Sequence, residues 1–328
     1  MKNFSYHRLH KPTTISGRAV TKEERTTLGS DRSSYRAIRQ ENVAHRVTHI
    51  VDALGVHFAS VLWQAAANLG EVSAAIEKLP AAVWKTIGSA RSNQPTFMQA
   101  VASLEAPGLA HPRNLEGEED LFYTTTVASN MEAWESFLKA PTVRQLSQAA
   151  IHGMAQTFPA VASFQAALAS APRLTATRPT GSFIFGLQTG LGINAITSAT
   201  ELAPHRDTQD FGPGISTLIP LGSFDPDEQD SGAVLLHEPK LKILARPGDI
   251  VFFSAATLAH STCPLAPGHA RGSLVGFTHA GVVRALRIGR LVKKASRGQR
   301  FGFECKVREL WRSHQALKKK ARAARKLL

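Results

Sequence analysis

Two patterns of hydrophobic and polar positions divide the chain near residue 181. Before that point, apolar residues recur three or four positions apart, which is the spacing of one face of an α-helix. The longest such series consists of Val43, Val47, Ile50, Val51, Leu54, Phe58, Val61, Leu62 and Ala65. It predicts a long amphipathic helix with its apolar side inward. Shorter helices follow, punctuated by Gly70, Pro80 and Pro95, and further helices are predicted at about 131–139 and 143–170.

After Gly181 the pattern changes to short runs of strand character separated by turn residues. Eight such runs are present, at residues 182–187, 192–197, 215–221, 233–237, 242–245, 250–254, 258–262 and 273–279. Eight short strands with turns between them are typical of a double-sheet jelly roll. The predicted fold class is therefore α+β, with a jelly roll over about 181–283 that N-terminal helices brace.

Composition divides the chain further. Residues 1–35 lack apolar periodicity and are predicted to be a poorly ordered, flexible basic arm, followed by a helical N-terminal region at 36–120. The stretch 106–120, with two prolines, two glycines and four acids, is typical of a connection. Residues 121–290 are then the domain that contains the jelly roll, and residues 291–328 a basic C-terminal helix.

The net charge of +14 is concentrated at one end of the chain. Residues 284–328 hold sixteen Lys/Arg and two acids, whereas residues 1–283 hold twenty-three of each. An apolar stripe at helical spacing runs through the basic segment, consisting of Val307, Leu310, Trp311, His314, Leu317, Ala321, Ala324 and Leu328. Together the stripe and the cations predict a basic amphipathic helix.

Such a helix is compatible with several roles. It can dock by its apolar stripe and expose its charges to water, or it can contact a phosphate backbone, where each neutralised phosphate adds affinity by counterion release. Residues 318–326 also fit a nuclear-import signal, and we expect nuclear localisation on that basis. A membrane-surface or calmodulin-target helix has the same composition. Charge alone leaves these readings open.

Composition also excludes some classes of protein. The chain has no run of eighteen apolar residues and no basic-then-apolar opening, so we expect neither a membrane span nor a secretion signal. Its two cysteines, Cys263 and Cys305, match no zinc spacing and cannot form a disulfide framework, which fits a reducing compartment.

Candidate chemistry lies in the jelly-roll segment, in the order His205-Arg-Asp207, then His260 fifty-three residues after the aspartate, then Arg271 eleven further on. His205 and Asp207 stand two apart, so on an extended segment they point to the same side of the chain. Two histidine nitrogens and a carboxylate on one face of a metal suit iron(II) and leave three positions open for a bidentate cosubstrate and O₂. We therefore expect His205, Asp207 and His260 to be the iron ligands and the catalytic centre.

We expect Arg271 to bind the cosubstrate, because a planar guanidinium pairs bidentately with a carboxylate such as that of 2-oxoglutarate. The run from Arg271 to His279 alternates as a strand, with Arg271, Ser273 and His279 on one face. An H-x-D pair alone is weak evidence, and a single Arg or His is usually structural. The combination in this order is typical of an Fe(II)- and 2-oxoglutarate-dependent oxygenase, and it assigns that activity to residues 121–290.

The segment from about Gly181 to Gly289 resembles the Tet/JBP superfamily of nucleic-acid-base oxygenases, most closely the fungal Tet-like proteins. The resemblance covers about a third of the chain and rests on His205-Arg-Asp, Ser216–Phe224, Leu241-Lys, Pro247-Gly-Asp, Ser254–Ser261 and Phe277-Thr-His-Ala-Gly. It implies a double-stranded β-helix, iron on His205, Asp207 and His260, and 2-oxoglutarate held by Arg271 with Ser273.

The resemblance further implies a methylated base as substrate, contacted by the residues at positions 210 and 279. Tet-like proteins often carry Asn at the first of these positions, whereas this chain has Asp210. The second position is His279. An ionised Asp210 accepts the exocyclic N–H of N6-methyladenine or the N4 amine of 5-methylcytosine but cannot donate to cytosine N3. Asp210 equally fits a carboxylate that orders the turn. Asn194 is a third candidate for substrate binding.

The predicted activity is thus hydroxylation of a methylated DNA base, 5-methylcytosine or N6-methyladenine, by O₂, leading to demethylation. In duplex DNA the base must first be flipped out of the helix. Two alternatives remain open from the sequence: an oxygenase acting on a protein side chain or small metabolite, and a non-catalytic DNA-binding accessory protein. The sequence does not decide whether the substrate is DNA or RNA, which methylated base is preferred, how far oxidation proceeds or what the oligomeric state is.

Overall fold

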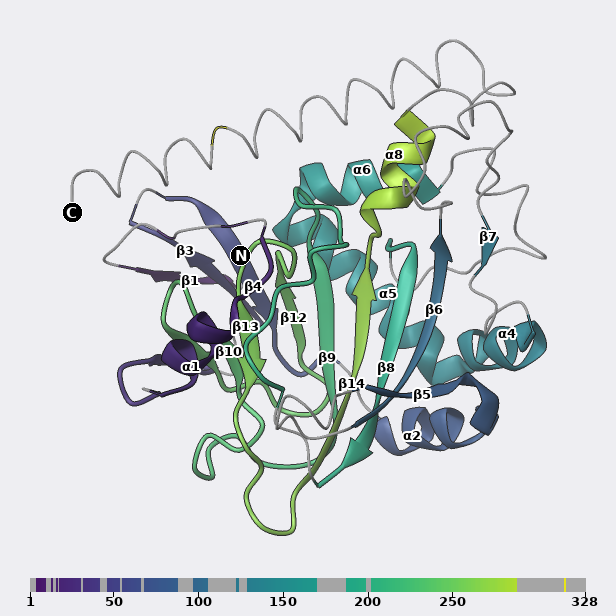
Figure 1. Ribbon diagram of the computed structural model, residues 1–328, viewed down its shortest axis with the longest axis horizontal. Coiled ribbons are helices and arrows are strands. Elements are labelled where there is room, and N and C mark those ends of the chain that lie inside the picture. Colours follow the sequence, from purple (N-terminus) through teal and green to yellow (C-terminus); the bar gives the residue numbers. More distant parts are fainter. Residues whose placement is uncertain are drawn as a thin grey trace.

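The structure is a computed structural model that describes residues 4–9, 13, 16, 18–30, 32–41, 46–53, 55–65, 68–87, 97–105, 122–123, 129–169, 187–198, 202–287 and 316. The predicted connection at 106–120 lies outside the described residues. So do the predicted strand at 182–187, except for Leu187, and the predicted basic helix at 291–328, except for Ala316. The described part is α+β, as predicted (Figure 1).

Ten strands of the described residues form one large sheet. Its order is β1 (Phe4–Arg8), β3 (Val47–Val51), β4 (His57–Leu62), β12 (Ile250–Phe253), β9 (Ser216–Ser223), β14 (Ala270–Phe277), β8 (Gly190–Thr197), β6 (Phe97–Glu105) and β5 (Trp84–Ile87), with β7 (Phe122–Tyr123) paired to β6. Strands β1 and β3 are parallel, and the other neighbours are antiparallel.

A smaller, four-stranded sheet has the order β13 (His260–Thr262), β10 (Val234–Leu236), β11 (Leu241–Ile243) and β2 (Arg36–Ile38). From β8 onward the chain passes back and forth between the two sheets, so that β8, β9, β12 and β14 lie in the large one and β10, β11 and β13 in the small one. His205 forms an isolated antiparallel bridge with His260, so the segment of His205 lies beside β13 at the edge of the small sheet. This alternating order is that of a double-stranded β-helix, and β8 to β14 correspond to the predicted runs from 192–197 onward.

The long helix predicted over residues 43–65 is wrong, because this segment forms the hairpin of β3 and β4. Its β-branched residues favour a strand. Both faces of the hairpin are largely buried, so its apolar and polar residues do not alternate in the manner of a strand with one exposed face. The turn is marked by Gly55 at φ +74° and by the side chain of Asp52, which accepts the N–H of Val56 at 2.9 Å.

The N-terminal arm also differs from the expectation of poor order. Strand β1 pairs with β3, and helix α1 (Lys22–Ser30) follows it. Helix α1 begins with a capping box, in which Thr21 and Glu24 each accept the backbone N–H of the other. The described residues of the region 36–120, which is predicted to be helical, contain mainly strands, with one α-helix, α2 (Leu69–Glu77), and a 3-10 turn, η1 (Ala81–Val83).

Four further helices complete the described fold: α4 (Met131–Lys139), α5 (Pro141–Thr157), α6 (Pro159–Ala169) and α8 (Ala280–Arg287). Helix α4 matches its prediction, whereas the predicted helix 143–170 is interrupted at Phe158, with Pro159 beginning the next helix. Within the described residues, no helix has the length and apolarity that crossing a membrane requires.

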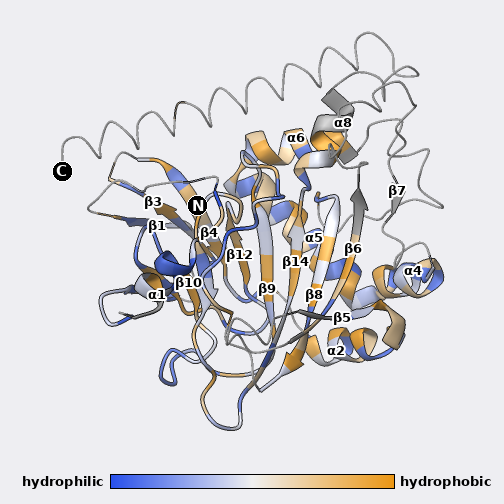
Figure 2. Cartoon of the chain, in the orientation of Figure 1, coloured by the Kyte–Doolittle hydropathy of each residue, from blue (hydrophilic) through white to orange (hydrophobic). Residues whose placement is uncertain are grey.

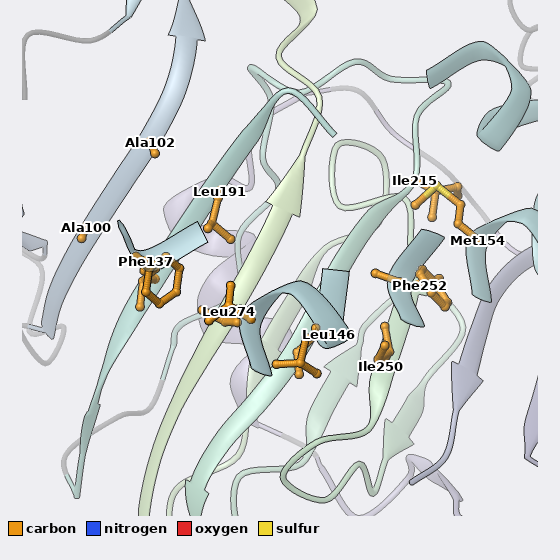
Figure 3. Close-up of a cluster of buried hydrophobic side chains, with 14 of the residues drawn as sticks. Ala100, Ala102, Phe137, Leu146, Met154, Leu191, Ile215, Ile250, Phe252 and Leu274 are labelled. Atoms are coloured by element: carbon orange, nitrogen blue, oxygen red, sulfur yellow. The ribbon is translucent and has the colours of Figure 1, made fainter. Parts of the chain in front are cut away.

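The main hydrophobic core lies between the helices and one face of the large sheet (Figure 3). Leu146 and Met154 of α5 pack there with Ile250 and Phe252 of β12. The approach is close at Gly153, where a Cβ atom would lie 2.9 Å from the Phe252 ring. Strand β12 is strongly hydrophobic and α1 strongly hydrophilic (Figure 2).

A second core lies between the two sheets. Alternate residues of a strand face opposite sides, so the residues of β12 that do not face the helices face the small sheet. Thus Val251 and Phe253 of β12 pack against Leu236 and Ile243 of the small sheet. The space between the sheets is therefore lined by apolar residues of β10, β11 and β12, and four of the predicted site residues, His260, Arg271, Ser273 and Asn194, lie on β13, β14 and β8.

Candidate metal centre

The structure brings His205, Asp207 and His260 together, as predicted. Each offers one ligand atom, and these atoms all lie within 4.8 Å of one another. Nε2 of His205 lies 3.7 Å from Oδ1 of Asp207, and Nε2 of His260 lies 3.8 Å from Oδ2. Three ligand atoms at these separations surround a point that a metal ion can occupy.

Backbone pairing positions the three ligands. His205 and His260 form an antiparallel bridge, and the backbone N–H of Asp207 donates to the carbonyl of Ala255 at 3.0 Å. Two histidines therefore face one another from adjacent segments, and the aspartate two residues on points to the same side.

Hydrogen bonds fix which nitrogen of each imidazole faces the metal position. Nδ1 of His205 lies 2.8 Å from the carbonyl oxygen of Ala203, and Nδ1 of His260 lies 3.1 Å from that of Leu258. A carbonyl only accepts, so each Nδ1 carries the proton and donates it. Each Nε2 then presents its lone pair to the metal position, which is the arrangement that metal-binding histidines use.

Burial keeps His260 in the form that binds metal. Only 7% of this residue is exposed, and burial, with the neighbouring His205 as the second cause, lowers the pKa of His260 to about 4. A neutral imidazole is the metal-binding form. Two neutral imidazoles and one carboxylate are the donor set that suits iron(II) with open positions for other ligands.

Arg271 lies on β14, which borders the interior of the jelly roll, and is 2% exposed. Its guanidinium carbon lies 5.8 Å from the centre of the Phe224 ring, and burial lowers the pKa of Arg271 to about 10. It therefore stays cationic at neutral pH. Gly232 makes room for it, because a Cβ atom there would lie 2.8 Å from Cδ of Arg271. A buried cation of this kind suits a carboxylate ligand.

Ser273 and Asn194 are held together by the sheet. The two residues are partners in the register of β14 and β8, and Nδ2 of Asn194 donates to Oγ of Ser273 at 2.8 Å. Oδ1 of Asn194 accepts from Nε2 of Gln99 at 2.9 Å. Asn194 thus orients the Ser273 hydroxyl, while its role in substrate binding stays a prediction.

Asp210 and His279 are paired in an isolated β-bridge, so the two predicted base-contacting residues lie side by side. The N–H of Gly281 donates to Nδ1 of His279 at 3.1 Å, which leaves Nε2 as the protonated nitrogen, 3.3 Å from Oε1 of Gln209. Burial, with the charge of Asp207 as the second cause, raises the pKa of Asp210 well above its usual value. The ionised form considered from sequence is therefore disfavoured, and a protonated Asp210 can also donate to an acceptor such as cytosine N3.

One buried ion pair beside the centre was not singled out from the sequence. Arg206, the residue between His205 and Asp207, donates through Nη2 to Oε1 of Glu238 at 2.5 Å. The arginine was visible within the H-R-D motif, but nothing in the sequence around Glu238 marks that acid as its partner.

No protein-family model and no curated protein matches the chain. Among solved structures it is similar to NgTET1 in complex with 5mC DNA, with 13% identity, 79% of this chain and 87% of that chain covered, and a TM-score of 0.48. It is also similar to an oxidoreductase of the 2OG-Fe(II) oxygenase family from Burkholderia pseudomallei, with 13% identity, 74% and 95% covered, and a TM-score of 0.36. A third, JOX2 in complex with 2OG, Fe and JA, shares 10% identity, with 77% and 71% covered and a TM-score of 0.28. Likeness at this level assigns no family or activity, so the chemistry rests on the residues of the site.

Proposed function

We propose that the protein is an Fe(II)- and 2-oxoglutarate-dependent dioxygenase that hydroxylates the methyl group of a methylated DNA base, 5-methylcytosine or N6-methyladenine. The observation that carries the oxygenase part is the group of His205, Asp207 and His260, whose ligand atoms lie within 4.8 Å of one another. The donor set, with both imidazoles presenting Nε2, fits iron(II).

Arg271 supports 2-oxoglutarate as the cosubstrate. It is a fully buried cation on a strand that borders the interior of the jelly roll, and it matches the carboxylate at the far end of 2-oxoglutarate. When bound, iron(II) with 2-oxoglutarate and O₂ supplies the oxidising chemistry that hydroxylates a methyl group. The chain itself binds the metal, orients the cosubstrate and positions the substrate.

The methylated-base part rests on Asp210 and His279 and on the charge of residues 284–328. Nε2–H of His279 is a donor, and Asp210 beside it offers a carboxyl group, so the pair can hydrogen-bond to the edge of a flipped base. The sixteen Lys/Arg of residues 284–328 are suited to hold the phosphate backbone while the base is extruded. Nuclear localisation belongs to the same proposal.

The decisive experiment is anaerobic reconstitution of the full chain with iron(II), followed by O₂, 2-oxoglutarate and duplexes that carry one 5-methylcytosine or one N6-methyladenine. Nucleosides and succinate are measured by mass spectrometry. We expect loss of one of the two marks together with succinate formation. His205→Ala abolishes both, whereas His269→Ala, at a half-buried histidine paired with Glu228 and outside the metal-binding group, leaves both unchanged.

Arg271→Met tests the cosubstrate site in the same assay. Removing a charge-assisted bidentate contact costs roughly 3 kcal/mol, so the 2-oxoglutarate concentration required rises about 100-fold while iron is still bound. Succinate formation with both marks intact would contradict the methylated-base assignment and favour a protein side chain or metabolite as substrate. Duplex binding without any succinate would favour the non-catalytic reading.

A further inference from the structure

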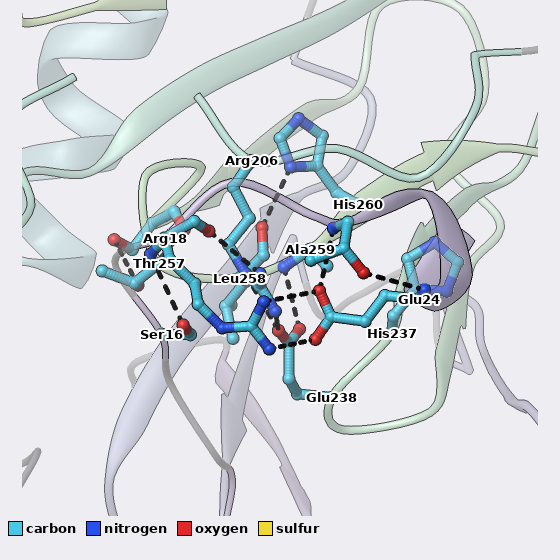
Figure 4. A network of polar contacts seen from close by, with 12 residues as sticks. Ser16, Arg18, Glu24, Arg206, His237, Glu238, Thr257, Leu258, Ala259 and His260 are labelled. Carbon is cyan, nitrogen blue, oxygen red and sulfur yellow. Dashed lines mark hydrogen bonds and ion pairs between the residues drawn. The ribbon is translucent and has the colours of Figure 1, made fainter. Parts of the chain in front are cut away.

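The side chain of Arg206 points away from the metal position, because His205 and Asp207 on either side of it point toward that position. It ends in a buried ion pair with Glu238, a residue in the turn between β10 and β11 (Figure 4). The side chains are 6% and 10% exposed. Both Nε, at 3.2 Å, and Nη2, at 2.5 Å, donate to Oε1 of the glutamate.

The second carboxylate oxygen of Glu238 reaches the other metal-binding segment. Oε2 accepts the backbone N–H of Ala259, the residue before His260, at 2.8 Å. One carboxylate therefore connects the segment of His205 and Asp207 with the segment of His260. Nη1 of Arg206 also donates to the carbonyl of Arg18 at 3.1 Å, which attaches the N-terminal segment to the same network (Figure 4).

We propose that Arg206 and Glu238 are positioning residues that set the affinity and the coordination geometry of the metal centre by fixing how its two segments are spaced and oriented. This inference rests on the metal site of the proposed function and extends it to two residues that contact no metal. The planar fork of arginine suits the task, since one guanidinium reaches the carboxylate through two nitrogens and the Arg18 carbonyl through the third.

The backbone hydrogen bonds of the site leave a role for the ion pair. They pair His205 with His260 and join the N–H of Asp207 to the carbonyl of Ala255, and the ion pair adds a side-chain connection from Arg206, between the two ligands, to the segment of His260. Without the ion pair of Arg206 and Glu238, the segment that carries His205 and Asp207 can adopt more conformations. Metal binding then has to restrict these conformations, which weakens it. Loss of partners that orient metal ligands typically weakens metal binding by about 10- to 100-fold.

The test is an anaerobic titration of the full chain with cobalt(II), which is followed by the visible absorption of the bound ion. Arg206→Met removes the ion pair, Arg206→Lys keeps the charge without the fork, and Glu238→Gln keeps an acceptor for Ala259. The matched control is Arg246→Met, which removes an exposed ion pair with Asp227 in which the two side chains are 54% and 42% exposed. Circular dichroism and thermal unfolding report on the fold of each variant.

We expect Arg206→Met to weaken cobalt binding about 10- to 100-fold and to change the absorption spectrum, with a smaller loss for Arg206→Lys and for Glu238→Gln. Arg246→Met leaves affinity and spectrum unchanged. If Arg206→Met does not fold, the two milder variants decide the question. Wild-type affinity and spectrum in variants that are merely less heat-stable would overturn the positioning role. Absence of cobalt binding by the wild-type chain would instead overturn the metal site itself, and this inference with it.

Discussion

The backbones of His205 and His260 exchange two hydrogen bonds, N–H of His205 to the carbonyl of His260 at 3.0 Å and the reverse at 2.9 Å. Two residues that are distant in sequence are thereby fixed as direct cross-strand neighbours, with ring centres 4.2 Å apart. The metal position thus depends on the pairing of two segments of the jelly roll. It does not depend on the conformation of one loop.

This relationship predicts that metal binding needs both histidines. Replacing either with Ala removes one of three protein ligands, and we expect cobalt(II) or zinc affinity, measured by calorimetry, to fall by more than about 100-fold. His269→Ala keeps the wild-type affinity, because His269 pairs with Glu228 away from the group. Equal affinities in all three variants would show that the metal binds elsewhere.

Gly232 is predicted to control the orientation of Arg271. It has φ +64°, and a side chain there would lie 2.8 Å from Cδ of Arg271. Gly232→Ala therefore displaces the arginine, and we expect 2-oxoglutarate binding, measured by calorimetry on the metal-loaded protein, to weaken about tenfold or more while metal affinity is unchanged.

Gly268→Ala is the matched control for this prediction. Gly268 also has positive φ, +81°, but a Cβ atom there meets nothing within 4 Å. Both variants carry the backbone strain of a non-glycine residue at such a φ, and only Gly232→Ala adds the contact with Arg271. A similar change in 2-oxoglutarate binding in both variants would mean that strain, rather than the displacement of Arg271, causes it.

Two helical glycines are predicted to respond oppositely to alanine. Gly70 in α2 has free space around its Cβ position, so Gly70→Ala stabilises the fold by roughly 0.5–1 kcal/mol through helix propensity. Gly153 in α5 lies against Phe252, and Gly153→Ala forces that ring to move, with a typical cost of about 1–3 kcal/mol. Urea unfolding of both variants measures the two free energies, and a stabilising Gly153→Ala would contradict the close packing of α5 on β12.

The jelly roll could be predicted from sequence because its strands are short and separated by turn residues. The grouping of His205, Asp207 and His260 could be predicted because His205 and Asp207 lie two apart on an extended segment. The N-terminal half was less predictable. Strands β3 and β4 are largely buried on both faces, with Val61 packed between the two sheets and Leu62 packed toward α5, so their apolar residues do not alternate and their spacing also fits a helix.

The supporting residues of the site could not be predicted, for a different reason. Glu238 and Gly232 act through contacts with Arg206 and Arg271, which come from distant parts of the chain. No local pattern marks such a partner, because the contact exists only once both sheets have formed. The strand conformation of β1 likewise depends on its pairing with β3, which the sequence of β1 alone does not indicate.

His237 is predicted to make the protein sensitive to acid. It is buried, it hydrogen-bonds through Nδ1 to the Tyr35 hydroxyl at 2.7 Å and through Nε2 to Oγ of Ser261 at 2.9 Å, and burial lowers its pKa from 6.5 to about 3. The folded state therefore resists protonation that the unfolded chain accepts. The stability from this group is fully present above pH 6.5 and is lost as the pH falls toward 3, by about 1.4 kcal/mol per pH unit.

The measurement is urea unfolding of the metal-free protein at several pH values between 7 and about 4. His237→Gln keeps polar groups of similar size but cannot be protonated, so we expect its stability to fall less steeply with acid, by about 1.4 kcal/mol per pH unit relative to the wild type. Parallel pH dependences of the two proteins would show that His237 is protonated equally in the folded and unfolded states.

Removal of residues 304–328 is predicted to weaken duplex binding. This segment holds nine Lys/Arg and two acids. If it binds the phosphate backbone, removing each cation that neutralises a phosphate reduces the slope of log affinity against log salt by about 0.9. We therefore expect the truncated chain to bind an unmodified duplex at least about tenfold more weakly at low salt, with a shallower slope, in a fluorescence anisotropy titration.

The alternative role of this segment, docking by its apolar stripe, predicts a different result. Leu310→Ser combined with Trp311→Ser preserves every cation and disrupts the stripe. If the segment docks on the fold, this double variant lowers the thermal unfolding temperature, and truncation lowers it too without changing the salt dependence of DNA binding. If the segment binds DNA, the salt slope falls in the truncated chain and not in the double variant, because the slope counts charges and is independent of apolar contacts. The pair of variants therefore separates a nucleic-acid contact from a structural one by measurements on the same chain.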